Sequence, residues 1–480
     1  MITLKNLLFG ILLLYSMTAK ATTVSLDSCR QMAVKANKTI RMAEENLDAA
    51  AHYKKAAQAA YLPGIDFNAT YMYNQRIINL LGEDAKLPTM SFDPKTMSYQ
   101  YNLVTGADGM PVKDPSTGSY IPSEVAVIPK EAMSYDIHNV FAGAVTLTQP
   151  VYMGGEIRAL NQIAGYGEKL AEAAKNSLTQ DLIYAVDEAY WTVISLLSKK
   201  ELAASFVNVV DTLLYNVKAM VDEGVATKSD LLSVEVRLNE ARIAYTKVEN
   251  GLSLSRMALA QLCGLPVYTE MKLEDEENEK KTTLAENTLE INFNEVYERR
   301  QDLEMVRQTI NILKGREKLA LGSMLPKIAL IGAYGFSNPN VINGFEKRFG
   351  GGFNVGATLT VPIWHWGGDY RKYKAAKSTT NAQRYLLEDL EDKVRLQVTQ
   401  AQYKVEEARK TLEMTHENLA KADENLNQAR YGFQEGVLTI SDVLMAQTAW
   451  LAANSENIDA GINLRLCHTY LEKVLGNSRY

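Results

Sequence analysis

In the segment Val355–Arg371, VGATLTVPIWHWGGDYR, a strand pattern, a strand-ending proline and the start of a helix pattern follow one another directly. Apolar side chains alternate with polar or small ones from Phe353 to Val361, which is the period of a strand with two different faces. Pro362 ends the alternation, and after Gly367-Gly368 more than sixty residues follow without Gly or Pro. The segment therefore predicts an amphipathic strand followed by a helix much longer than those of globular domains.

The same order of signals occurs earlier, at Ala142–Arg158, AGAVTLTQPVYMGGEIR, where Pro150 is expected to close the strand. Other landmarks recur in matching order: Leu62-Pro63 with Leu325-Pro326, Tyr190 with Tyr403, Glu223-Gly224-Val225 with Glu435-Gly436-Val437, and Gly264 with Gly476. The chain is therefore a tandem repeat, and one copy could not close a sheet by itself.

Composition and the first residues narrow the function classes. The 480 residues are 46% hydrophobic and 22% charged, and the net charge of -6 does not indicate a basic surface for binding nucleic acid. Residues 1–21 combine Lys5, an apolar run and an Ala-Lys-Ala cleavage site, as a secretory signal peptide does. We therefore expect an exported chain that begins at Thr22 and binds no nucleic acid.

The cysteines and histidines show no pattern typical of a metal site, and we expect neither a cofactor nor an enzymatic activity. Cys29, Cys263 and Cys467 lie at non-equivalent places in the two repeats without CxxC spacing, so we expect buried, unpaired thiols. A lipid anchor on Cys29 is disfavoured because Asp27 would lie inside the lipobox. The five histidines are scattered, and no nucleophile and base occur together.

The first repeat is assigned to residues 22–265. Its expected elements are a helix at 25–60, strands at 65–74 and 137–149, a long helix at 156–221 and a return helix at 229–263. Between the strands, residues 75–136 hold six of the twelve prolines and lack sustained periodicity. That stretch predicts a long loop or small irregular insert.

The second repeat is assigned to residues 293–476. Its expected elements are a helix at 293–323, strands at 327–337 and 352–361, a long helix at 369–434 and a return helix at 441–475. Gly350-Gly351-Gly352 is interpreted as turn chemistry, because no GK[ST] follows it. Residues 266–292, with the acidic run Glu274-Asp275-Glu276-Glu277, predict a linker packed at mid-length.

Both long helices carry a coiled-coil seam. In the second copy the seam alternates strictly in steps of four and three: Ala401, Val405, Ala408, Leu412, Thr415, Leu419, Ala422, Leu426, Ala429 and Phe433. Each helix, of about 66 residues, would be near 100 Å long at about 1.5 Å per residue. In each repeat, the lengths of the short helix and the return helix together match that of the long helix.

Each long helix ends in a glycine, and each return helix starts with a capping sequence. Gly224 and Gly436 are expected to be left-handed caps. Thr227-Lys-Ser-Asp230 and Thr439-Ile-Ser-Asp442 have the spacing of capping boxes. Capping alone would explain both aspartates.

The four strands have the length that crosses a bilayer when tilted. Aromatic residues near strand ends are expected to form an interfacial belt, although ordinary packing is the alternative: Tyr71, Tyr73, Tyr152, Tyr334, Trp364 and Trp366. Because open strand edges are not tolerated in lipid, the sheet must close by oligomerisation. Two copies would give eight strands and three would give twelve.

With these features the sequence resembles the TolC-like outer-membrane efflux proteins over nearly all of the mature chain. The resemblance rests on SLDSCRQMAVKANKTI at 25–40, the LPG and LPK strand starts, the two strand–Pro–aromatic–Gly-Gly joins, and the tips EGVATKSDLLSVEVRL and EGVLTISDVLMAQTAW. It implies a mixed α and transmembrane β fold, with a homotrimer closing a twelve-stranded outer-membrane barrel continuous with a periplasmic α-helical barrel. Residues 75–136 would then be extracellular.

The resemblance also implies an exit duct that docks to a periplasmic adaptor and an inner-membrane pump through its helical tips. The tip residues are Gly224, Val225, Thr227, Ser229, Gly436, Val437, Thr439 and Ser441. In the family the periplasmic end is narrowed by two acidic residues one turn apart, an aromatic and a basic residue. Here the positions hold Asp442, Met445, Phe433 and Leu438, so Phe433, Leu438 and Met445 could form a hydrophobic constriction instead, with Asp230 as the counterpart of Asp442.

A rival hypothesis is an exported coiled-coil structural or adaptor protein without a pore. The four amphipathic strands argue against it, because their alternation would serve no purpose in a soluble spacer. A pore that works without a pump is a further alternative.

Overall fold

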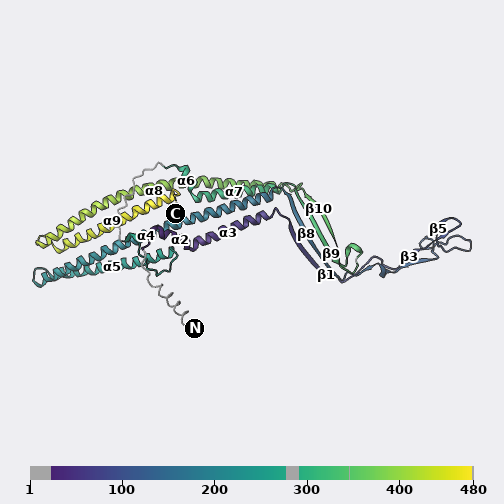
Figure 1. The fold of residues 1–480 in the computed structure, drawn as a ribbon, viewed down its shortest axis with the longest axis horizontal. Helices are drawn as coiled ribbons and strands as arrows, with labels where there is room; N and C mark the ends of the chain where they lie inside the picture. Colours follow the sequence, from purple (N-terminus) through teal and green to yellow (C-terminus); the bar gives the residue numbers. More distant parts are fainter. Residues whose placement is uncertain (1–22, 277–290, 345, 478–480) are drawn as a thin grey trace, which may run out of the picture. The chain divides into compact units, whose positions relative to one another are not determined.

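The computed structural model describes residues 23–276, 291–344 and 346–477, and it separates into two compact units (Figure 1). A helical unit comprises the described residues within 1–57, 158–320 and 370–480, and a strand unit comprises those within 58–157 and 321–369. The expected signal peptide at 1–21 and residues 277–290 of the linker lie outside the described residues. Among the described helices, none has a stretch long and apolar enough to cross a membrane.

The strand unit is built on a four-stranded antiparallel sheet. Its order is β1-β8-β9-β10, in which β1 is Gly64–Tyr73, β8 Asn139–Met153, β9 Lys327–Asn338 and β10 Gly350–Thr360. One row across the sheet pairs Phe67 with Val145, Val145 with Tyr334, and Tyr334 with Phe353. The adjacent row pairs Asp66, Thr146, Ala333 and Asn354 in the same way. The apolar and polar faces expected from the alternation are therefore confirmed across all four strands.

The expected end of the second strand at Pro150 is wrong. β8 continues to Met153, pairing with β9 through a register shift between Pro150 and Tyr152. The ladder between β1 and β8 has already ended at Thr148, so the missing N–H of Pro150 removes no hydrogen bond on that side. A proline at a bulge is compatible with a strand.

The interpretation of Gly350-Gly351-Gly352 as a turn is also wrong. The three glycines open β10 and pair with Ser337, Phe336 and Gly335 of β9. A Cβ on Gly351 would lie 2.7 Å from the Gly335 carbonyl oxygen and 2.8 Å from the Tyr334 hydroxyl. Glycine is therefore needed here for close approach between strands and not for a turn.

The insert between β1 and β8 has more order than the sequence predicted. It contains three nested two-stranded ladders: β2 (Ile78–Asn79) with β7 (Ser134–Tyr135), β3 (Ala85–Pro88) with β6 (Val125–Ile128), and β4 (Met90–Asp93) with β5 (Ser98–Tyr101). Each ladder is only two to four residues long, which is too short for alternation to be recognised in the sequence. At its base, Asp136 pairs with Lys347 at 2.6 Å.

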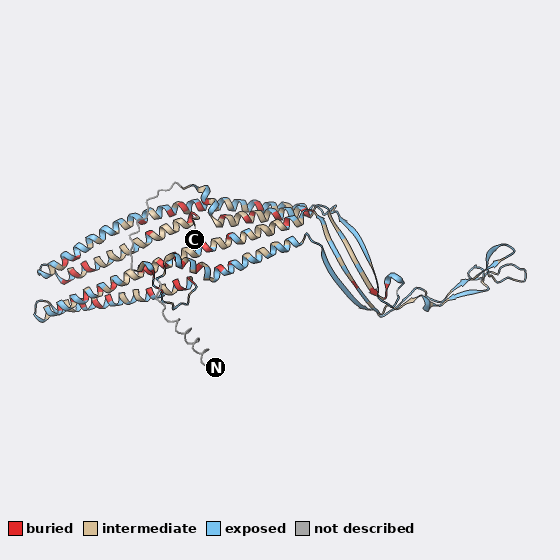
Figure 2. Ribbon diagram, viewed as in Figure 1, coloured by how far each residue is buried: buried red, intermediate tan, exposed pale blue. Residues whose placement is uncertain are grey.

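The helical unit contains two hairpins of unequal helices. In the first, α4 (Glu156–Asp222) is followed by α5 (Lys228–Leu262), and in the second α8 (Gly368–Gln434) is followed by α9 (Ile440–Val474). The two long helices have 67 residues each, close to the expected lengths. Every seam residue expected in α8 is buried or half-buried (Figure 2). Near the tips both hairpins share one apolar cluster, which includes Val217, Val234, Leu426 and Val443.

The two short helices are each broken, contrary to the expectation of one continuous helix per repeat. The first is α2 (Leu26–Ala36) and α3 (Lys38–Ala59), and the second is α6 (Phe293–Arg299) and α7 (Gln301–Gly322). The backbone is extended at Asn37, with ψ 129°, and at Arg300, with ψ 116°. The Asn37 side chain accepts a hydrogen bond from Thr39 N, so it caps the next helix.

The breaks lie where the return helices end. Gly264 and Gly476 have φ of +71° and +74°. A Cβ on Gly264 would overlap the Ala36 Cβ, and one on Gly476 would lie 2.8 Å from the Arg299 Cβ. The end of each return helix therefore packs directly on the break in the short helix.

The described part of the linker packs against the helical core, as expected. Met271 and Leu273 are buried with residues of α4 and α5. In the short 3-10 helix η2 (Glu274–Glu276), Asp275 accepts a hydrogen bond from the Tyr190 hydroxyl at 2.6 Å, and Glu276 pairs with Arg256 at 2.7 Å. The acidic run thus supplies partners for buried polar groups.

Candidate functional site

The two helical tips have the same backbone. Gly224 and Gly436 have φ of +73° and +71°, as expected for left-handed caps. The N–H groups of the next two residues donate to one carbonyl in the last turn, that of Met220 in the first tip and of Gly432 in the second. This geometry leaves Val225 and Val437 72% and 78% exposed. Each tip therefore presents a strongly exposed valine, flanked by exposed Thr and Ser residues.

Asp230 and Asp442 both cap their own helices. Asp442 Oδ2 accepts from Thr439 N at 2.8 Å and from Thr439 Oγ1 at 2.6 Å, while Thr439 Oγ1 accepts from Asp442 N. Asp230 makes the same bonds with Thr227. The threonine hydroxyl, and next the threonine N–H, lower the pKa of both carboxyls below the usual value for aspartate. Helix capping therefore accounts for the aspartate at both positions.

The three apolar residues of the expected constriction occupy different environments. Phe433 is half-buried against the apolar cluster shared by the hairpins. The Leu438 side chain lies over Gly432, where an added Cβ would be 2.7 Å from Leu438 Cδ1. Met445 is 64% exposed. The structure thus packs Phe433 on the cluster shared by both hairpins and Leu438, 37% exposed, on its own tip, and it leaves Met445 at the surface.

Met445 lines a groove between α5 and α9 of about 580 Å³. Its other lining residues are Arg237, Leu444, Thr448, Ala449 and Ala452. Arg237 crosses the groove and donates to Thr448 Oγ1 at 2.6 Å, and it pairs with Glu240 at 2.9 Å. The guanidinium also lies over the Phe206 ring, 5.3 Å from its centroid. Arg237 therefore ties the first hairpin to the second.

Sequence reasoning did not single out Arg237, although it lies within the quoted first tip. Val234, Leu238 and Ala241 form the buried seam of α5, and Arg237 directly precedes Leu238. A charged residue beside a seam is normally read as solvated. Its partner Thr448 is 211 residues away, so only the packed structure reveals the contact.

Five of the six expected interfacial aromatics lie at the two ends of the sheet. Tyr71 and Tyr73 lie towards the end that bears the insert, and Tyr71 contacts Phe141 with ring centroids 4.7 Å apart. Tyr334 lies in the interior of the sheet, in the same row as Phe67 and Phe353. Trp364 and Trp366 follow β10 at the opposite end, 70% and 89% exposed, and Tyr152 lies near the end of β8. Between them the apolar face exposes Ile65, Phe67 and Val355.

The sheet thus has an uncovered apolar face between two groups of aromatics. Within the described part of the chain, no strand pairs with the outer edge of β1 or of β10. A large exposed apolar face with aromatic ends fits lipid much better than water.

Comparison with known proteins agrees with this arrangement. The family model described as outer membrane efflux protein matches residues 123–265 and 292–477, which is more than half of the chain. A comparison with curated proteins found no match.

Several solved structures share the fold at low sequence identity. The MtrE outer membrane channel of Neisseria gonorrhoeae is 17% identical with a TM-score of 0.70, over 94% of this chain and 88% of that one. The CmeC outer membrane channel of Campylobacter jejuni is 16% identical with a TM-score of 0.69, over 95% and 87%. The outer membrane protein VceC of Vibrio cholerae is 14% identical with a TM-score of 0.69, over 94% and 96%. With the match to the family model, the chain belongs to the outer membrane efflux protein family, and it is an outer-membrane channel protein that extends into the periplasm.

Proposed function

We propose that three copies of the chain form the exit duct of a tripartite efflux or secretion system, together with a periplasmic adaptor and an inner-membrane pump. The observation that carries this proposal is the four-stranded sheet with one apolar face and two free edges. In lipid, unpaired backbone groups at a strand edge cost several kcal/mol each, so β1 of one copy would pair with β10 of the next. Three copies give the twelve strands expected from the resemblance to TolC-like proteins.

The tips are the proposed docking surface for the adaptor. Val225 and Val437 are exposed in both repeats although nothing in the hairpin fold requires an apolar side chain there. Exposed apolar residues that recur at equivalent positions are typical of contact surfaces. The serines and threonines beside them would supply hydrogen bonds at the rim of the contact.

The groove between α5 and α9 is the proposed place of the constriction. Met445 supplies the exposed apolar side chain, while Arg237 and Thr448 hold the two hairpins together. A hydrophobic neck can close a pore by excluding water, without any pair of acidic residues. Asp442 is assigned to helix capping in this proposal.

The docking proposal is tested with the double variant Val225→Asp and Val437→Asp. A charge at each tip should abolish export and cross-linking to the adaptor, because an apolar contact surface does not accept an unpaired carboxylate. Val267→Asp is a matched control, since Val267 is an exposed valine of the helical unit outside the tips.

The double variant must still be present in the outer membrane at the level of the wild type. Normal export by the double variant would contradict docking through the tips. A separate measurement tests for a pore. If the purified wild-type protein gives no discrete conductance in a planar bilayer, the alternative hypothesis of an exported structural protein without a pore is favoured.

A further inference from the structure

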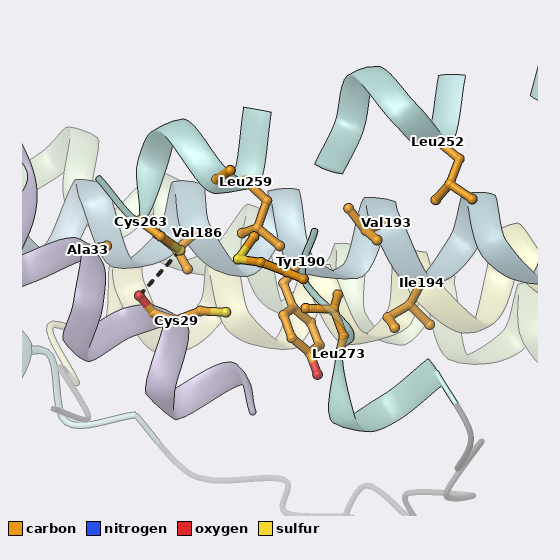
Figure 3. Packing of buried hydrophobic residues seen from close by; sticks show 12 residues of the cluster. Cys29, Ala33, Val186, Tyr190, Val193, Ile194, Leu252, Leu259, Cys263 and Leu273 are labelled. Carbon is orange, nitrogen blue, oxygen red and sulfur yellow. Dashed lines mark hydrogen bonds between the residues drawn. The ribbon is translucent and has the colours of Figure 1, made fainter. Parts of the chain in front are cut away.

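Two cysteines that are far apart in the sequence meet in the core of the first repeat. Cys29 lies in α2 and Cys263 directly follows α5, and neither side chain is exposed. The Cys263 Sγ atom lies 3.7 Å from the Cys29 carbonyl oxygen (Figure 3). Both residues belong to one buried apolar cluster. The structure holds both as free thiols.

The surroundings keep this pair together and away from water. Val186, Leu259 and Ala260 pack in the same buried cluster as both cysteines. The segment before α2 is also held in place, because Val24 pairs with Leu273 of the linker. The neighbouring thiol and burial together raise the pKa of the Cys29 thiol, which disfavours the reactive thiolate of Cys29.

The second repeat builds the same junction without cysteine. By the repeat correspondence, Cys29 matches Asn292 and Cys263 matches Leu475. Leu475 packs in the equivalent apolar cluster of the second repeat, and Gly476 contacts the broken short helix as Gly264 does. Packing at this junction therefore does not require two thiols.

We propose that Cys29 and Cys263 are joined by a disulfide in the exported protein. The family places the chain outside the cytosol, in a compartment where disulfides form and persist. The bond would tie α2 to the end of α5 across 234 residues, and it would replace the expectation of free thiols at these two positions.

The oxidant would be the disulfide of a thiol–disulfide oxidoreductase. One cysteine thiolate attacks that disulfide, forming a mixed disulfide and releasing one oxidoreductase thiolate. The second cysteine thiolate then attacks the mixed disulfide, which forms the Cys29–Cys263 bond and releases the other oxidoreductase thiolate. Two S–H bonds are lost from this chain, and the two protons and two electrons reside on the reduced oxidoreductase. Because neither thiol is accessible after packing, the exchange precedes closure of the junction.

The test counts free thiols in the full-length protein from outer membranes. Cells are quenched in acid, and the protein is denatured in SDS with a maleimide-polyethylene glycol reagent, with or without prior reduction. The proposal predicts one adduct per chain without reduction, on Cys467, and three after reduction. Cys467→Ser should give no adduct without reduction and two adducts after reduction. Cys29→Ser should give two adducts without reduction, because Cys263 then has no partner.

Three adducts on most chains without reduction would overturn the proposal. Two adducts in both conditions would also overturn it, because that pattern means that one thiol is blocked by another modification, such as a lipid on Cys29. A single adduct on Cys29→Ser without reduction would show that Cys263 pairs elsewhere and would overturn it as well.

Discussion

The first and second repeats share a backbone at two places, the tips and the junctions, but differ in the side chains placed on it. Both tips have a left-handed glycine, an exposed valine and a capping box, and both junctions place a left-handed glycine on a broken helix. The side chains differ where the hairpins face each other: Met445 corresponds to Ser233, Thr448 to Val236, and Ala449 to Arg237. The shared glycines and capping boxes are features that the fold needs, whereas the shared valines are not. The residues that differ line the groove between α5 and α9, which is specific to the contact between the two hairpins.

The tips also show how one turn accepts two packings. In the second tip Leu438 lies over Gly432, and in the first the corresponding residues are Ala226 and Met220. The second tip combines a small Gly432 with a large Leu438, and the first combines a large Met220 with a small Ala226. The combined side-chain volume of each pair is therefore similar, while the surface around the turn differs.

The largest expected effect is at the junction glycines. Gly264→Ala and Gly476→Ala should each lose roughly 3 kcal/mol of stability, from about 1–2 kcal/mol for the left-handed backbone and about 1–3 kcal/mol for the overlap. Gly224→Ala and Gly436→Ala are matched controls with the same sign of φ but no atom within 4 Å of the added Cβ. They should lose only about 1–2 kcal/mol. Thermal loss of helical circular dichroism measures all four, and equal losses would contradict the packed junction.

The next effect concerns the threonine caps, where the repeats should behave alike. Thr227→Val and Thr439→Val should each destabilise the first turn of the return helix by about 1 kcal/mol, because the aspartate N–H loses its hydroxyl acceptor and the carboxylate loses its hydroxyl donor. Hydrogen exchange in the first turns of α5 and α9 measures this. Thr246→Val, within α5, is the control and should change nothing at the tip. An effect in one tip alone would mean that the two caps are not equivalent.

A smaller effect is expected from Met445→Ser, which gives the second tip the residue of the first. If Met445 forms the apolar neck, the variant should raise single-channel conductance in a planar bilayer modestly, since a polar side chain wets the constriction. Ser233→Met is the reverse exchange and should not raise conductance. A conductance unchanged by Met445→Ser would remove Met445 from the constriction.

The smallest effect is expected from Asp442→Asn. Conductance and cation selectivity should equal those of the wild type and of Asp230→Asn, because both carboxylates face their own threonine. The lowered pKa gives stability that is present above the usual aspartate pKa of about 3.9 and is lost as pH falls through the lower folded-state pKa. Variant and wild type should therefore converge in thermal midpoint only in strong acid. Weaker cation selectivity in Asp442→Asn alone would assign its carboxylate to the pore.

Much of the fold could be predicted from the sequence because alternation, capping boxes and glycine caps each depend on residues close together in the chain. The faces of the four strands follow from alternation, and the tips follow from Gly436 and the Thr439–Asp442 spacing. The break at Asn37 could not be predicted, because asparagine within a run of helix-forming residues is only mildly unfavourable. The recurrence of Gly264 and Gly476 was the available signal, and its meaning depended on a tertiary contact.

The candidate site was less predictable, because its contacts join distant segments. Asp442 was correctly linked to capping through its spacing from Thr439, a local rule. The link from Arg237 to Thr448 and the meeting of Cys29 with Cys263 span more than 200 residues each. No periodicity within either helix carries that information.

The central claim is that four strands from each of three chains close one barrel, and native mass measurement in detergent tests it most directly. The protein purified from outer membranes should have the mass of three mature chains, with no stable smaller species. A monodisperse monomer with intact strands would contradict the claim, because the free edges of β1 and β10 would then have to be tolerated without a partner chain.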